Sequence, residues 1–215
     1  MTRTTHFEST AFGALLTAAA GGLDAYSYLV HGGVFAGLQT GNLILLGVQG
    51  GQGHWTAMSR YLLALAAFAA GTLIVRLVQR HRRFVHHRNH RRRAIIGYVL
   101  LLLGGVWALG PHVSDPLAVA GLSLAAAALL QEFRQLNGAP FTPLMMTGNL
   151  RTLTESLLDG WLFGDLPART RAGRTAVIML TFAVGAAGVA ALVQWDARLA
   201  LGLPASLLLI AGVVG

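Results

Sequence analysis

Two identical polar tripeptides interrupt otherwise apolar stretches of this 215-residue chain: Thr40-Gly41-Asn42 and Thr147-Gly148-Asn149. In lipid, polar residues that break a helix are costly unless they line a protein-enclosed or wet cavity. Glycine allows unusual backbone angles, and Thr and Asn side chains can cap a broken helix and offer oxygens or an amide to a solute. We therefore predict that both tripeptides break a helix and bind substrate. The alternative is that the glycines are small packing positions, with Thr and Asn forming hydrogen bonds between helices.

A polar residue stands sixteen positions before each of the two threonines, Asp24 in the first case and Gln131 in the second. An intramembrane carboxylate is by default a functional candidate, because its charge is costly there unless it is paired or hydrated. Asp24 could bind a cation or exchange a proton; alternatively, it makes a hydrogen bond at a helix end. Glu132 follows Gln131, so the two polar sites carry different charges. We assign these three residues to the substrate-binding set, together with Tyr28, which ends the run Gly21–Tyr28.

The surroundings of the two tripeptides match as well, because leucines recur at the same spacing of 107 positions. This agreement predicts an internal duplication, with one repeat over about residues 11–110 and the other over about residues 116–215. The matched pairs are Leu23 and Leu130, Leu29 and Leu136, Leu43 and Leu150, and Leu46 and Leu153.

Hydrophobic residues make up 54% of the chain and charged residues only 11%, against roughly 25% charged residues in soluble domains. With a mean hydropathy of +0.60, this composition predicts one integral membrane domain over residues 1–215 that crosses the lipid bilayer several times. The absence of cysteine excludes disulfides, thiol catalysis and cysteine-ligated metals. All sixteen basic residues are arginine. Together with abundant Ala and Gly, this is typical of bacteria with GC-rich genomes, and we expect the bacterial inner membrane.

No catalytic set emerges from the other polar residues. His54 and His112 lie in predicted loops without partnering carboxylates, and Ser123 and Ser156 have no neighbouring base. We therefore expect no catalytic residue, no metal and no cofactor, and an intramembrane enzyme is the weakest functional interpretation.

The predicted fold class is an all-α membrane protein with about six transmembrane helices, each of which needs about 20 apolar residues, with a range of about 17 to 25. Two further segments, Val34–Gly50 and Phe141–Leu158, contain the tripeptides and lie near the lower length limit. The six stronger segments are Ala11–Val30, Ala57–Gln79, Ala94–Leu109, Pro116–Leu136, Thr175–Gln194 and Leu199–Val214.

Seven of the sixteen arginines lie in one loop, residues 80–93, between the second and third of these segments. Arginine-rich loops stay in the cytoplasm. The formal charge of +8 is therefore explained by a basic cytoplasmic loop of a membrane protein. We expect this loop to contact anionic lipid, and we expect no nucleic-acid partner. Its four histidines have no carboxylate or cysteine nearby, so they do not favour a metal site.

If loop 80–93 is cytoplasmic, the arginines after the second tripeptide indicate whether that segment spans the membrane or re-enters it. If Phe141–Leu158 spanned the membrane, the arginines of loop 159–174 would lie outside, against the positive-inside tendency. A re-entrant segment keeps them inside. If Val34–Gly50 is interpreted in the same way, both segments that contain a tripeptide are broken or re-entrant. The two repeats then have inverted topology, and both termini lie in the cytoplasm. Eight full spans with parallel repeats is the competing arrangement.

The run Gly-x-Leu-Asp-Ala-x-x-Tyr at Gly21–Tyr28, followed by Phe35 and the first Thr-Gly-Asn, resembles the YoaK-like family of small bacterial membrane proteins. In the second half, Gln131 and Thr147-Gly148 match the family's pattern, whereas Glu132 stands where that family typically has Asn. The resemblance covers nearly the whole chain, residues 12 to 212. It implies about six spans in the inner membrane and no established substrate.

The residues predict a transporter or channel-like permease for a small solute, linked to protons or cations through Asp24, with its pathway between the two repeats. The alternative is a non-transporting membrane scaffold or accessory subunit. A homo-oligomer is compatible with either. Polar residues that line a wet cavity would favour transport, and dry polar residues bonded to one another would favour the scaffold.

Overall fold

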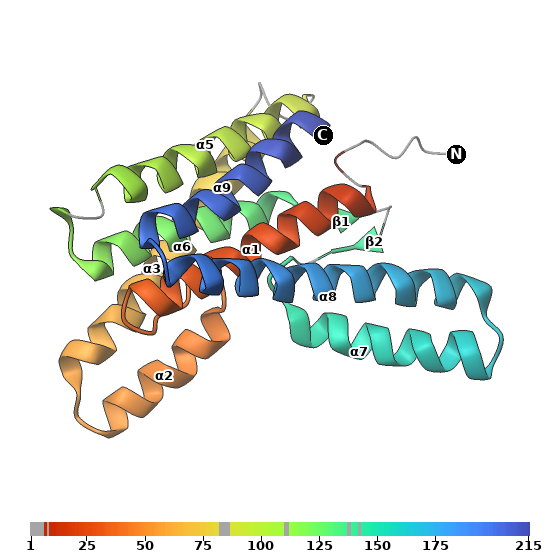
Figure 1. Cartoon of the computed structure of the whole chain (residues 1–215), viewed down its shortest axis with the longest axis horizontal. Helices are drawn as coiled ribbons and strands as arrows, with labels where there is room; N and C mark the ends of the chain where they lie inside the picture. Colours follow the sequence, from red (N-terminus) through yellow and green to blue (C-terminus); the bar gives the residue numbers. More distant parts are fainter. Residues whose placement is uncertain (1–6, 8, 82–86, 110–111, 137–138, 142) are drawn as a thin grey trace.

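The computed structural model describes residues 7, 9–81, 87–109, 112–136, 139–141 and 143–215, and in this part the chain is almost entirely helical (Figure 1). This confirms the predicted all-α class. In chain order, the helices are α1 (Thr10–Val30), α2 (Gln39–Gly51), α3 (Trp55–Arg80), α5 (Arg88–Leu109), α6 (Asp115–Glu132), α7 (Met146–Leu157), α8 (Leu166–Val193) and α9 (Ala197–Val214).

The only regular β-structure in the described residues is a short antiparallel hairpin between α6 and α7. Its strands are β1 (Gln135–Leu136) and β2 (Ala139–Pro140). The predicted segment Pro116–Leu136 therefore ends as a helix four residues early, because the backbone leaves the helical region at Phe133 (φ −100°, ψ 77°). A π-helical turn, Leu158–Leu162, joins α7 to the loop before α8.

The central helices α1 and α6 lie antiparallel to each other. At one end of the molecule, the ring of Phe12 at the start of α1 contacts that of Phe133 just after α6, with 5.2 Å between centroids. At the other end, Nδ1 of His31 lies 3.0 Å from Oδ1 of Asp115, which begins α6. Helix α1 packs mainly on α8 and α9, whereas α6 packs mainly on α3 and α5.

Helices α1 and α8 run in the same direction and approach very closely. Gly13 lies against Ile178, and Gly22 lies further along against Val189. Between them, the hydroxyls of Thr17 and Thr181 are 2.8 Å apart. A methyl group added at Gly185 would overlap the carbonyl oxygen of Ala18. Small residues thus allow the two backbones to meet, as is usual between helices in membranes.

Within the described residues, four helices are long and apolar enough to cross a membrane: α3, α5, α8 and α9. The chain is therefore a membrane protein, as predicted. Helices α1 and α6, the other two of the six predicted spans, lie in the middle of the bundle, where many of their residues are buried against protein. A helix that is covered by other helices can be rich in Ala and Gly and still be shielded from water, so it needs less hydrophobicity than a lipid-facing helix.

The third predicted span begins earlier than expected, at Arg88 instead of Ala94. Its basic first turns are helical because their side chains find partners within the protein. Arg91 Nε donates to both carboxylate oxygens of Glu132, each at 3.0 Å, and the buried Arg92 lies over the ring of Phe7. The predicted loop 80–93 is thus partly helix. Its residues 82–86 lie outside the described residues.

Candidate functional site

The two Thr-Gly-Asn tripeptides begin two short helices, α2 and α7, whose first turns meet at one cleft. The cleft has a volume of about 570 Å³. Thr40 and Gly41 line it from α2, and Thr147 and Gly148 line it from α7. The chain segments that lead into the two helices also touch: a Cβ added at Gly37 would lie 3.3 Å from Cγ of Leu144.

Neither short helix has a side-chain cap at its N-terminus. The N-cap residues are Leu38 for α2 and Met145 for α7, and neither forms a side-chain cap hydrogen bond. The expectation that Thr or Asn side chains cap the helix breaks was therefore wrong. Because the first peptide N–H groups of a helix have no partner within it, they carry partial positive charge and favour an electronegative group. Two such helix ends line the same cleft.

Asn42 is fully buried and closes the loop that leads into α2. Its Oδ1 accepts a hydrogen bond from the backbone N–H of Phe35 at 2.9 Å, and its Nδ2 donates to the Phe35 carbonyl oxygen at 2.7 Å. Nδ2 also lies 3.0 Å from Oε1 of Gln39. Asn42 is not among the residues that line the cleft. It fixes the non-helical backbone from which the cleft-lining residues extend.

The carboxylate of Asp24 ties α1 to the same loop. Its Oδ1 accepts hydrogen bonds from the backbone N–H groups of Gly37 at 2.6 Å and Leu38 at 3.2 Å. Oδ2 is buried and has no hydrogen-bond partner in the described part of the chain. The two partners lie thirteen and fourteen residues later in the chain, at the start of α2, whose N-cap residue is Leu38.

Asp24 and Tyr28 line a second cavity of about 420 Å³ beside the cleft, against α8. The ring of Tyr28 stacks on Phe35, with 4.8 Å between centroids. Leu38 lines both cavities and separates them. Asp24 and Tyr28, two of the predicted site residues, therefore lie in a cavity next to the Thr-Gly-Asn cleft, and Leu38 lies between that cavity and the cleft.

Gln131 and Glu132 lie elsewhere, in a polar cluster at the basic end of the bundle. Gln131 Nε2 donates to Oε1 of Gln79 at 3.1 Å. Gln79 Nε2 donates in return to the Gln131 carbonyl oxygen and to Oε2 of Glu132, both at 3.0 Å. No hydrogen bond between Gln131 and the segment before α7 is described, so the second half has a different arrangement at the position that matches Asp24. Gln79 and Arg91 complete this cluster, and sequence spacing gave no signal for either.

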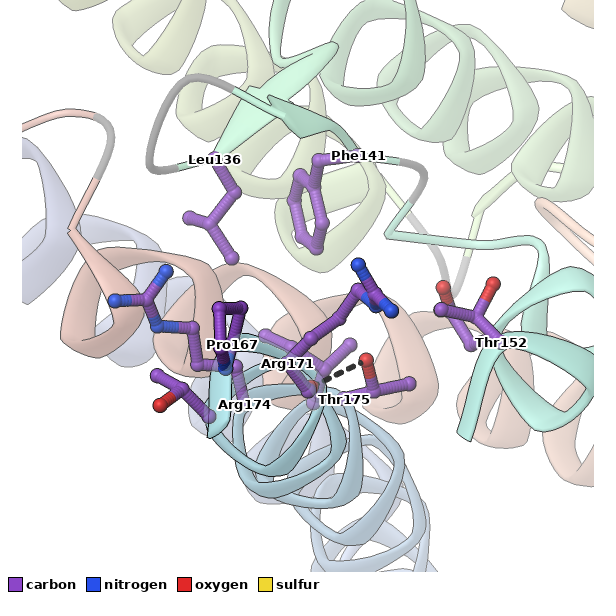
Figure 2. A pocket seen from close by; sticks show the side chains of 10 residues that line it. Leu136, Phe141, Thr152, Pro167, Arg171, Arg174 and Thr175 are labelled. Carbon is purple, nitrogen blue, oxygen red and sulfur yellow. Dashed lines mark hydrogen bonds between the residues drawn. The ribbon is translucent and has the colours of Figure 1, made fainter. Parts of the chain in front are cut away.

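Asn149, the last residue of the second tripeptide, turns away from the cleft. It lines a separate cavity of about 310 Å³ between α7, α8 and the β-hairpin (Figure 2). The structure thus brings together four of the ten predicted site residues, Thr40, Gly41, Thr147 and Gly148, at one cleft, and distributes the others around it.

These features define a polytopic α-helical membrane protein with a cleft between the first turns of two short helices. The chain belongs to the DUF1275 family, which is described as a protein family of unknown function. The model of this family matches residues 12–214. The YoaK-like resemblance is consistent with this membership. No curated protein and no solved structure matches the chain.

We predict that the hydrogen bonds from the N–H groups of Gly37 and Leu38 to Asp24, which tie α1 to the loop before α2, require an oxygen acceptor at position 24. Asp24→Asn retains Oδ1 and is expected to melt within a few degrees of the wild type in detergent. Asp24→Leu leaves the buried N–H of Gly37 without its acceptor, which costs about 1–3 kcal/mol, and its melting temperature should fall clearly below that of the Asn variant. Equal melting temperatures for the Leu and Asn variants would contradict the proposed tie.

Proposed function

We propose that this protein is an inner-membrane permease for a small solute and that the cleft between α2 and α7 is its pathway. One observation carries the proposal: two helix N-termini without side-chain caps line one cleft, together with the exposed residues Thr40 and Thr147. This arrangement supplies backbone N–H donors and hydroxyl groups between the two halves of the chain. Partial positive charge at the start of α7 favours an anion or a solute with electronegative groups, whereas at the start of α2 the Asp24 carboxylate already accepts from the N-cap residue Leu38.

We further propose that the two halves form an inverted repeat of three spans plus one broken segment each. The helices follow in the same order at a spacing of 107, so that α1, α2, α3 and α5 correspond to α6, α7, α8 and α9. Packing supports this correspondence: α1 pairs with α8, and α6 pairs with α3. The antiparallel direction of α1 and α6 favours an inverted over a parallel repeat.

The short length of α2 and α7 argues against eight full spans. They contain 13 and 12 residues, which corresponds to about 20 and 18 Å of helix, and the π-helical turn Leu158–Leu162 extends α7 to about 25 Å at most. The hydrocarbon core of a bilayer is about 30 Å thick. Neither helix can cross it alone, so the broken or re-entrant arrangement is preferred.

The arginines favour an orientation with both termini in the cytoplasm. The end of α3, the start of α5 and the end of α6 meet through Gln79, Arg91 and Glu132. The start of α8 lies at the same end, because α8 is parallel to α1. This basic end is expected to be cytoplasmic. The arginines placed there are Arg76, Arg80, Arg88, Arg91, Arg92, Arg93, Arg134, Arg169, Arg171 and Arg174.

Cysteine labelling tests this topology, since the natural chain has no cysteine. We expect Ser114→Cys to react with a membrane-impermeant maleimide on intact spheroplasts, because it precedes α6 at the end opposite the basic one. Gly173→Cys, near the start of α8, should react only after the membrane is permeabilised. Labelling of both variants from the outside would contradict the inverted repeat.

Asp24 is proposed to link transport to protons or cations. Its Oδ1 holds the loop before α2, while Oδ2 has no described partner, so a change in its charge would act directly on the wall of the cleft. No other charged side chain among the described residues lines the cavity that contains it. Asp24 is therefore the titratable group best placed to couple proton or cation binding to the position of α2.

A scaffold is the second candidate, and one observation favours it. Asn42 is bonded entirely within the protein, and Gln131 bonds with Gln79, as expected for polar residues that serve packing. Neither residue lines the Thr-Gly-Asn cleft, however. A scaffold has no need for two uncapped helix ends that line one cleft, so this candidate ranks second.

Filling the cleft tests the permease directly. Gly148 lies in its wall, and no atom outside its own helix lies within 4 Å of where its Cβ would be. Gly148→Leu should therefore fold normally and abolish solute entry. Gly97→Leu, at a helical glycine of α5 that has equally open surroundings, is the matched control.

The measurement is light scattering of proteoliposomes after mixing with chloride, nitrate, acetate and phosphate salts, urea and glycerol. We expect the wild type and Gly97→Leu to admit at least one of these solutes and Gly148→Leu to admit it at least about tenfold more slowly, which corresponds to about 1.4 kcal/mol of added barrier. If the three proteins are indistinguishable for every solute, the cleft is not a pathway.

A further inference from the structure

A second candidate site lies at the basic end of the molecule, away from the Thr-Gly-Asn cleft. It is the cavity of about 310 Å³ between α7, α8 and the β-hairpin. Leu136 and Phe141 cover it from the hairpin side (Figure 2). Figure 2 shows Arg171 and Arg174 extending from α8 to either side of Pro167, with Arg171 directed toward Thr152 of α7. The cavity is thus flanked by two guanidinium groups.

The charge of this cavity is not balanced by the protein. No carboxylate lines it among the described residues. The closest acidic residue along α7, Glu155, accepts a hydrogen bond from Arg151 at 2.9 Å on the exposed surface of the same helix. Two arginines, Arg171 and Arg174, therefore face one cavity without an acidic partner in its wall. A cavity whose wall holds two cationic side chains and no carboxylate favours an anion.

One of the two arginines is held in place for binding. Arg171 Nε donates a hydrogen bond to Oγ of Ser156 at 2.8 Å, which leaves the two terminal nitrogens of its guanidinium group to face the cavity. The structure describes no hydrogen bond or ion pair for Arg174 within the described residues. Thr175 Oγ1 donates its proton to the Arg171 carbonyl oxygen at 3.0 Å and so has none left for an anion, whereas no hydrogen bond is described for the Thr152 hydroxyl across the cavity.

We infer that this cavity binds a phosphate group, with Arg171 and Arg174 as the charged donors and Thr152 as a hydroxyl donor. Guanidinium groups suit phosphate because their planar donors match its oxygens in pairs. The apolar wall of Leu136, Phe141 and Ile178 accommodates the hydrocarbon that adjoins a phosphodiester. The phosphate belongs either to a free solute or to the headgroup of an anionic lipid in the cytoplasmic leaflet.

The site is connected to the cleft by one helix. Asn149 lines the phosphate cavity, and the preceding residues of α7, Thr147 and Gly148, line the Thr-Gly-Asn cleft. An anion bound against α7 and α8 would therefore fix the position of the helix that forms one side of the cleft. Binding itself does not require that the protein moves a solute, so it can be tested separately from transport.

The test is calorimetric titration of the purified full-length protein in neutral detergent. The probes are inorganic phosphate and short-chain phosphatidylglycerol, with short-chain phosphatidylcholine as the uncharged-headgroup control. Arg174→Gln should weaken binding of the active probe about tenfold or more, because it removes one of the two charged donors in the cavity wall. Arg151→Gln, an exposed arginine on α7 outside the cavity, is the matched control and should bind like the wild type.

The outcome identifies the source of the phosphate. Binding of inorganic phosphate that Arg174→Gln weakens assigns the site to a free solute, and binding of phosphatidylglycerol alone assigns it to a lipid headgroup. The inference is overturned if neither probe binds, if phosphatidylcholine binds equally well, or if Arg151→Gln and Arg174→Gln weaken binding to the same extent. Normal melting of both variants shows that the loss is one of binding and not of folding.

Discussion

A chain that leaves the helical conformation where it is buried must satisfy its peptide groups within the protein, and the cleft depends on how this protein meets that constraint. In the first half, two side chains do so. The Asp24 carboxylate accepts the N–H groups of Gly37 and Leu38, and the Asn42 amide binds both backbone groups of Phe35. These bonds hold the loop from which α2 begins. The N–H of Gln39 donates to the Gly37 carbonyl oxygen at 2.8 Å, and Thr40 and Gly41 follow in the wall of the cleft.

The two halves meet this constraint differently. Gln131, at the position that matches Asp24, bonds with Gln79, and within the described residues it has no hydrogen bond to the segment before α7. Glu132 is balanced by Arg91 from α5. In the second half, the β-hairpin between Gln135 and Pro140 lies in the connection instead. The first half thus ties the loop before its short helix with a carboxylate, whereas the matching residues of the second half bond within a charged cluster at the basic end, away from the cleft.

The positions of the helices could be predicted from the sequence, but the side-chain contacts between helices could not. Hydrophobic length located all six long helices, and the repeated Thr-Gly-Asn located the starts of α2 and α7, because both signals are local. Arg91, Gln79 and Ser156 were missed since their partners lie on other helices. The N-caps were predicted wrongly because propensity favours Thr or Asn at such positions, whereas tertiary bonds from Asp24 and Asn42 determine where α2 begins.

The central claim is that the segments before α2 and α7 meet between the two halves, and a disulfide tests it most directly. In this naturally cysteine-free chain, Gly37→Cys combined with Leu144→Cys should cross-link rapidly under mild oxidation, because a Cβ at position 37 lies 3.3 Å from Cγ of Leu144. Gly37→Cys combined with Gly97→Cys is the control and should not cross-link. Failure of the 37–144 pair to cross-link in the folded protein would contradict the account.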